Sequence, residues 1–162
     1  MAGRVLSDAS PLIGLGYVDG LHWLQQLFGV VWIPQEVNAE LINGQGFAGE
    51  AALLQAKGDG WLRLAGPTPS TPMLPDLDEG EAACIRTALA DAQPALLLMD
   101  ERAGRAVAMA NGWKVAGTAA VIGMAKQRGL IEQAKPVFER LHQSDFRISA
   151  EVIAVVLRRV GE

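Results

Sequence analysis

RVLSDASPLIGL, at residues 4–15, is the segment that most directly indicates the fold class. It opens with a short apolar run, which predicts a strand that begins at Arg4 and ends near Asp8. Ser10 and Pro11 then predict the start of a helix, because serine is favoured as N-cap and proline at the first helical position. A strand followed at once by a helix is the opening of a βαβ unit.

The same alternation of apolar runs and helical patterns continues along the chain and predicts a mainly parallel central sheet flanked by helices. The run ALLLM at 95–99 is apolar throughout, as expected for a strand buried on both faces. A proline-rich loop is expected at 66–75, and further strands at 30–33, 61–64 and 113–116. Helices are expected around 12–15, at 21–28, 34–42, 48–56, 78–90 and 101–111, from 118, and in two pieces of the tail, the second N-capped by Ser149.

Length and composition predict one soluble α/β domain over residues 1–162, since a chain of 162 residues, half of them hydrophobic, can bury one continuous core. The C-terminal helices, from about residue 134, are expected to complete that core or to form a dimer surface. Cys84 is the only cysteine, which excludes an internal disulfide and suits a reducing cytoplasm. No signal peptide opens the chain and no apolar run reaches the ~20 residues of a membrane helix. We therefore expect a cytoplasmic protein without a membrane partner.

The charge balance is acidic, with 18 acidic and 14 basic residues and a formal net charge of -4. A protein that coats a nucleic-acid duplex normally has a basic surface, because phosphate contacts dominate its affinity. Carboxylates that bind a metal ion would shift the balance in the observed direction, since the bound cation is absent from the count.

Two aspartates follow predicted strands at their carboxyl ends, the edge at which open α/β sheets bind ligands. For both, the alternative is a role as helix N-cap, where aspartate is favoured. Ser10 already occupies the expected cap position after Asp8, which argues against a cap there. Asp100 directly precedes the helix that begins at Glu101, so both interpretations of Asp100 stay open.

Several glutamates have similar alternatives. Glu36 and Glu40 lie four residues apart and share one helix face, where a solvated surface acid is the default interpretation. Asp78 and Glu81 have the spacing of a capping box. Glu81 also shares a stripe with Ile85, which places its carboxylate at the edge of the buried face. The residues alone do not choose between these interpretations.

Four segments, in order, resemble the motifs of the PIN-domain family. VLSDASPLI at 5–13 looks like the opening of PIN-domain proteins, and IPQEVNAEL at 33–41 is similar to their second motif. LDEGEA at 77–82 and LMDER at 98–102 match the two later acidic segments. Gly117 and Thr118 resemble a small-polar step of a toxin-like subgroup. The resemblance covers nearly the whole chain and implies a single PIN-like α/β domain.

The resemblance implies that Asp8, Glu40, Glu81 and Asp100 form an acidic site that holds Mg²⁺ or Mn²⁺ for RNA cleavage. Many family members have an aspartate at the position of Glu81, so Glu101 or Glu79 are alternative ligands to it. Mg²⁺ takes oxygen ligands and keeps several waters, so a few carboxylates are enough to hold it.

Other residues near these motifs are candidates for supporting roles. Arg102 and Arg105 follow Asp100 on the predicted helix and could steady phosphates, although solvated helix residues would look the same. Thr118 could hold a metal-bound water or act as an N-cap. Ser10 is a further candidate for support.

The expected function is that of a Mg²⁺- or Mn²⁺-dependent endoribonuclease, the toxin of a toxin–antitoxin pair. The expected partners are an RNA substrate, a small antitoxin protein and a second copy of the chain. The first alternative is a non-catalytic PIN-like module that binds RNA or protein. The second is a doubly wound phosphohydrolase with Asp8 as nucleophile, which is disfavoured because no second aspartate follows two residues after Asp8.

Overall fold

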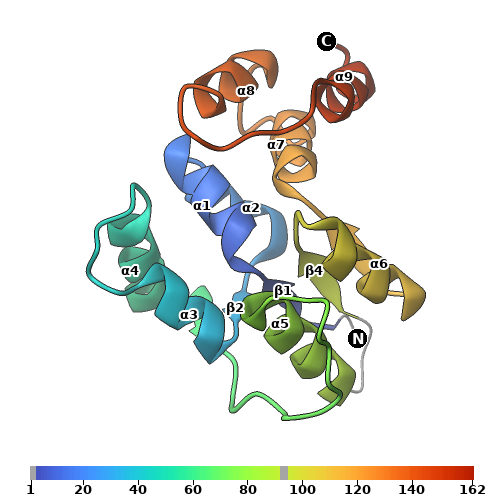
Figure 1. Ribbon diagram of the computed structural model, residues 1–162. Helices are drawn as coiled ribbons and strands as arrows, with labels where there is room; N and C mark the ends of the chain where they lie inside the picture. Colours follow the sequence, from blue (N-terminus) through green and yellow to red (C-terminus); the bar gives the residue numbers. More distant parts are fainter. Residues whose placement is uncertain (1–2, 92–94) are drawn as a thin grey trace.

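The centre of the computed structural model, which describes residues 3–91 and 95–162, is a five-stranded parallel sheet (Figure 1). Its spatial order is β3-β2-β1-β4-β5, and each pair of neighbours is parallel. The strands are β1 Val5–Ser7, β2 Val31–Ile33, β3 Leu62–Leu64, β4 Leu96–Leu98 and β5 Lys114–Ala116. The chain therefore builds the sheet outward from β1 on one side, and then places β4 and β5 on the other side.

Helices connect and flank the strands, as the alternating pattern predicts. Those of the described residues are α1 Ala9–Tyr17, α2 Leu21–Phe28, α3 Gln35–Leu41, α4 Glu50–Asp59, α5 Glu79–Ala90, α6 Arg102–Ala110, α7 Thr118–Gln127, α8 Lys135–Leu141 and α9 Ala150–Arg159. Helices α1, α2 and α7 pack against one another, whereas α5 packs with α6 and against β1. The core between these layers is apolar, and Leu6, Leu97 and Leu98 of the central strands have no exposed surface.

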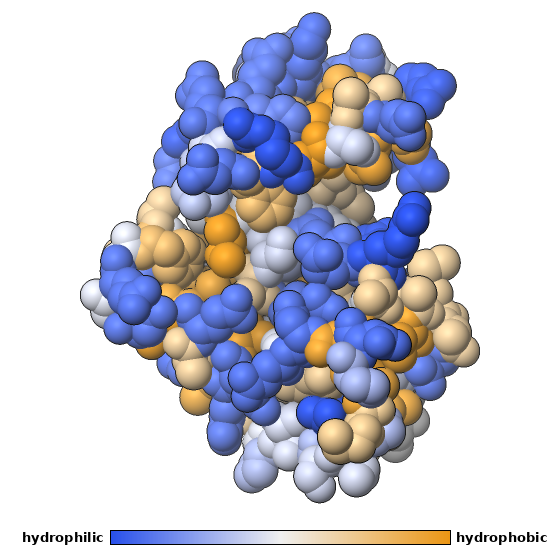
Figure 2. All heavy atoms as spheres, in the orientation of Figure 1, coloured by the Kyte–Doolittle hydropathy of each residue, from blue (hydrophilic) through white to orange (hydrophobic). Residues whose placement is uncertain are grey.

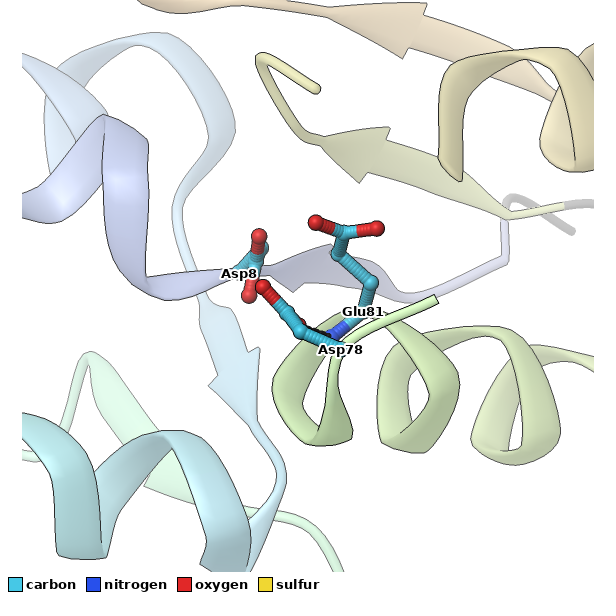
Figure 3. A group of neighbouring side chains, drawn as sticks. All are labelled: Asp8, Asp78 and Glu81. Carbon is cyan, nitrogen blue, oxygen red and sulfur yellow. Dashed lines mark hydrogen bonds between the residues drawn. The ribbon is translucent and has the colours of Figure 1, made fainter. Parts of the chain in front are cut away.

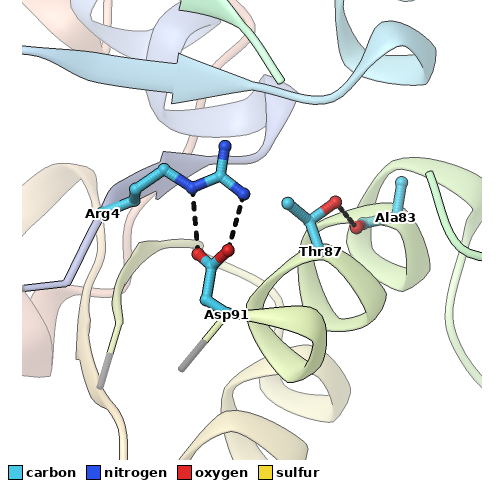
Figure 4. A network of polar contacts seen from close by, with 4 residues as sticks. All are labelled: Arg4, Ala83, Thr87 and Asp91. Carbon is cyan, nitrogen blue, oxygen red and sulfur yellow. Dashed lines mark hydrogen bonds and ion pairs between the residues drawn. The ribbon is translucent and has the colours of Figure 1, made fainter. Parts of the chain in front are cut away.

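An ion pair holds α5 in a fixed direction along β1. Arg4, which precedes β1, donates two hydrogen bonds of 2.9 and 2.8 Å to the carboxylate of Asp91, which follows α5 (Figure 4). The guanidinium of Arg4 also lies 5.1 Å from the ring centroid of Trp32, a cation–π distance. Because the C-terminal end of α5 is tied to the start of β1, the N-terminal end of α5 lies beside the residue that follows β1.

The C-terminal helices pack onto the rest of the chain through α7 and α1. Phe138 and Leu141 of α8 and Val156 of α9 belong to the buried cluster. Beyond α9, the Glu162 side chain accepts hydrogen bonds from the N–H groups of Ala134 and Lys135, at 2.6 and 3.0 Å. The last residue thereby fixes the start of α8.

The structure corrects the expected start of the first helix. α1 begins at Ala9, and Asp8 occupies the N-cap position in an extended conformation. Ser10 therefore lies inside the first turn, where its hydroxyl donates to Asp100 instead of capping the helix. Pro11 is the third helical residue, a position where the missing N–H costs no intrahelical hydrogen bond. Within the described part of the chain, no helix is long and apolar enough to cross a membrane.

Candidate metal centre

Asp8 lies at the point where the strand order reverses, between β1 and β4. In open parallel sheets, ligands bind outside the carboxyl ends of the strands at such a reversal. The N–H of Asp8 donates to the carbonyl of Leu98 at 2.9 Å, which ties Asp8 to the end of β4. Its side chain makes no cap hydrogen bond with α1, and only 4% of the residue is exposed. The buried carboxylate, which the N–H of Ala9 faces, thus keeps lone pairs for a further partner.

Two further carboxylates, from the start of α5, meet that of Asp8 (Figure 3). Asp8, Asp78 and Glu81 each offer one carboxylate oxygen, and these oxygens lie within 4.8 Å of one another. Asp8 and Glu81 are buried, and Asp78 is exposed. We call these three residues the acidic cluster.

The capping box predicted for α5 is only half formed. The carboxylate of Asp78 accepts from the N–H of Glu81 at 2.8 Å, as an N-cap should. The Glu81 side chain does not return to the N–H of Asp78, and no donor among the described residues hydrogen-bonds to its carboxylate. Instead it points toward the space above Asp8, although only 4% of the residue is exposed (Figure 3). Glu81 is therefore a buried acid whose nearest polar neighbours are the carboxylates of Asp78 and Asp8.

Glu40 reaches the same space from α3. A Cβ atom on Gly80 would lie 2.8 Å from Asp8 Oδ1 and 3.6 Å from Glu40 Oε2, so both carboxylates face the backbone of Gly80. Glu40 is an exposed residue and does not belong to the acidic cluster.

Asp100 lies on the neighbouring strand end and is held by hydrogen-bond donors. Its Oδ2 accepts from the hydroxyls of Ser10 and Thr118, at 2.9 and 2.8 Å, and its Oδ1 accepts from the N–H of Thr118 at 2.8 Å. Glu101 occupies the N-cap position of α6, so of the two interpretations left open for Asp100 the structure excludes the role as N-cap of that helix. Asp100 binds the first N–H of α7 instead. It lies outside the acidic cluster.

The sequence predicted Asp78 as the N-cap of α5 but not as a member of the acidic cluster. Its spacing from Glu81 predicted the cap and nothing more. The signal was present in the same spacing, because a capping side chain and the side chain three residues later lie on the same side of the first helical turn.

The electrostatics of the acidic cluster disfavour three charged carboxylates. Burial raises the pKa of Asp8 to about 7; the N–H of Ala9 opposes this shift, and the charges of Asp78, Glu40 and Asp100 add to it. Burial also raises the pKa of Glu81 to about 8, with contributions from Asp78, Asp8 and Glu101.

The pKa of Glu40 is raised as well, by partial burial of its carboxylate and by the charges of Asp78 and Glu79. A positive charge within this space would offset all of these effects.

A divalent cation with oxygen ligands fits these residues. Mg²⁺ and Mn²⁺ prefer carboxylate and water oxygens, and the acidic cluster supplies three carboxylates with a fourth, that of Glu40, across the space above Gly80. Histidine and cysteine ligands, typical of zinc, are absent from this group.

The remaining candidates from the sequence occupy the rim of the centre. Arg105 donates from Nη1 to the carbonyl of Met99 at 3.1 Å. Arg102, Glu101 and Glu79 are exposed at the starts of α6 and α5. Thr118 is the first residue of α7 and not its N-cap, which is Gly117.

A hollow of about 830 Å³ opens beside Asp100. Its lining combines Ser10, Asp100 and Arg105 with Phe146, Val152 and Val155 of the C-terminal segment. Figure 2 shows this face, notched between the C-terminal helices and α6. Asp100 therefore lines this hollow, whereas Asp8, Asp78 and Glu81 do not.

Comparison with known proteins gives one match. A family model described as "PIN domain" matches residues 4–162, nearly the whole chain. No curated protein and no solved structure matches.

Proposed function

Since the chain belongs to the PIN-domain family, whose members are generally nucleases, we propose that it is a Mg²⁺- or Mn²⁺-dependent endoribonuclease. The observation that carries this proposal is the acidic cluster at the reversal of the strand order. Two of its three carboxylates are buried, and the pKa values of both are raised to near or above neutrality. A cluster of this kind is stabilised by a cation, which is the usual reason to keep such groups together.

Asp8, Asp78 and Glu81 would hold the ion, with Glu40 on the opposite side of the space above Gly80. When bound, such an ion makes a water molecule more acidic and stabilises charge that develops on a phosphate. Asp100, which Ser10 and Thr118 fix and which lines the hollow, would bind the same ion through a water molecule and so orient that water. Arg105 is anchored on Met99 and has further N–H groups for a phosphate oxygen.

We further propose that the protein acts in the cytoplasm on single-stranded RNA, as the toxin of a toxin–antitoxin pair. An RNA strand without a partner strand could enter the hollow that Asp100 and Arg105 line. A small antitoxin or a second copy of the chain would contact α9, where Val152 and Val155 are 46% and 38% exposed.

The test is cleavage of labelled single-stranded RNA by purified protein in Mg²⁺, in Mn²⁺ and in EDTA. We expect cleavage in either metal, none in EDTA, and none by Asp8→Asn. Asp76→Asn is the matched control, because it makes the same change at an exposed aspartate of the loop before α5. If the wild type binds varied RNAs without cutting them, the chain is a non-catalytic binding module. Turnover of small phosphate esters through an aspartyl-phosphate would identify a phosphohydrolase instead.

A further inference from the structure

Two glycines border the carboxylates although their backbone does not need glycine. Gly80 is the second residue of α5, and Gly117, which precedes α7, has an ordinary φ of -92°. Neither belongs to the glycines of positive φ. A glycine inside a helix or strand costs roughly 0.5–1 kcal/mol relative to alanine. Backbone conformation does not explain glycine at these positions. The remaining explanation is the space that a side chain would occupy.

A side chain at either position would collide with a carboxylate. A Cβ on Gly80 would lie 2.8 Å from Asp8 Oδ1 and 3.3 Å from Val37 Cγ2. A Cβ on Gly117 would lie 2.7 Å from Asp100 Oδ1 and 3.3 Å from Arg105 Nη1. Contacts below 3.0 Å between carbon and oxygen are not tolerated, so something must move.

Neither carboxylate can move without loss. Asp8 is buried, and a methyl group on Gly80 would displace the carboxylate that meets those of Asp78 and Glu81. Oδ1 of Asp100 accepts the hydrogen bond from the N–H of Thr118, and a methyl group on Gly117 would displace it from that donor.

We propose that Gly80 and Gly117 are positioning residues of the metal centre, whose missing side chains leave the space that sets the orientation of Asp8 and Asp100. This inference rests on the proposed metal-dependent function. Mutation of residues that orient metal ligands typically lowers metal affinity or activity 10–100-fold.

The test compares four Gly→Ala variants by Mn²⁺ affinity, measured by calorimetry, and by melting temperature in EDTA. Gly80→Ala and Gly117→Ala are expected to weaken Mn²⁺ binding about tenfold or more. Gly58→Ala makes the same change in α4, where no atom lies within 4 Å of the new methyl group, and should bind as the wild type does. Gly123→Ala is the control for a clash elsewhere, because its methyl group would lie 2.8 Å from Val156 Cγ1, and it should lower the melting temperature alone.

Metal affinity separates positioning from simple packing, since a role in packing alone would make Gly80→Ala and Gly117→Ala behave like Gly123→Ala. RNA cleavage by the two site variants should recover in part at high Mn²⁺. Wild-type affinity in both of them would overturn the inference while the proposed function stands. A wild type that binds no Mn²⁺ would overturn both. If one variant does not fold, the other still decides, because the two glycines face different carboxylates.

Discussion

Asp8 combines a buried carboxylate with an N-cap position whose hydrogen bond it does not make. Substitution by asparagine therefore removes a charge and leaves the helix cap unchanged. The side chain keeps nearly the same volume, so the core around β1 and α1 is not disturbed.

The first prediction is that metal-free Asp8→Asn is more stable than the wild type at neutral and alkaline pH. The folded-state pKa of Asp8 is raised from 3.8 to about 7, so its contribution to stability is present below pH 3.8 and is lost as the pH rises through 7. The variant lacks this loss and should gain roughly 2–4 kcal/mol in its free energy of unfolding at pH 8. Melting curves in EDTA at a series of pH values measure the difference.

The pH dependence provides the control for that comparison. The two melting temperatures should converge toward pH 4 and separate between pH 4 and 8, while Asp76→Asn follows the wild type throughout. A variant that is less stable than the wild type at pH 8 would make Asp8 a structural hydrogen-bond partner and not a metal ligand.

The second prediction concerns the two hydroxyls that share Oδ2 of Asp100. Ser10→Ala and Thr118→Val each leave one hydroxyl donor on this oxygen, and the double variant leaves none. The free energy of unfolding of each single variant should be about 1–2 kcal/mol lower than that of the wild type, because hydrogen bonds to a charged group are stronger than those between neutral groups. The loss in the double variant should exceed the sum of the two single losses by roughly 0.5 kcal/mol or more. Urea unfolding of the four proteins measures the cycle, and strict additivity would mean that water replaces the hydroxyls.

At the scale of elements, the N-terminus of α5 has two roles that substitution can separate. Asp78 caps the helix through the N–H of Glu81 and also contributes a charge to the acidic cluster. Serine can cap a helix but has no charge, whereas alanine can do neither.

The third prediction follows from this separation. Asp78→Ser and Asp78→Ala should both weaken Mn²⁺ binding, because both lose the carboxylate. In EDTA, Asp78→Ser should be more stable than Asp78→Ala by about 1 kcal/mol, the usual value of an N-cap. Calorimetric titration and thermal melting check the two parts. Equal stability of the variants would mean that the cap contributes nothing, and unchanged Mn²⁺ affinity would remove Asp78 from the centre.

The elements themselves could be predicted from the sequence, because their signals are local. The apolar run at 95–99 became β4, and Ser149 caps α9 by accepting from the N–H of Val152 at 3.2 Å. The N-caps of α1 and α6, which are Asp8 and Glu101, could not be predicted. Ser10 has the right residue type at the right place for a cap, but its hydroxyl donates to Asp100, which is 90 residues away in the chain.

At the scale of the whole molecule, the strand order decides which acids meet. Asp8 and Asp100 were placed at one sheet edge from the sequence, and the reversal between β1 and β4 is consistent with that placement. The inclusion of Asp78 depends on the direction of α5, which the ion pair of Arg4 with Asp91 helps to fix. A contact over 87 residues leaves no local pattern, so this part of the centre required the structure.

The fourth prediction concerns the closure of the C-terminal helices by Glu162. Burial is the largest single effect on Glu162 and raises its pKa, but the hydrogen bonds from Ala134 and Lys135 and the ammonium of Lys126 together hold that pKa below its ordinary value. The contribution of the charged Glu162 side chain to the free energy of unfolding is therefore present above pH 4.5 and is lost as the pH falls through the lower folded-state pKa. Glu162→Gln should melt below the wild type at pH 7, and the difference should shrink on acidification, opposite in direction to Asp8→Asn. A difference that stays constant with pH would exclude the charge as its cause.

The reversal of strand order between β1 and β4 also has a consequence for biosynthesis. Asp8 leaves the ribosome before its neighbours in the centre, which come from α5 and from the end of β4. Chains fold as their segments become available, so the centre forms only after roughly the first hundred residues have emerged and paired. A nascent chain shorter than this has no assembled cluster. Any activity of the centre therefore begins only after β4 has inserted beside β1, and a product that ends before β4 is inert.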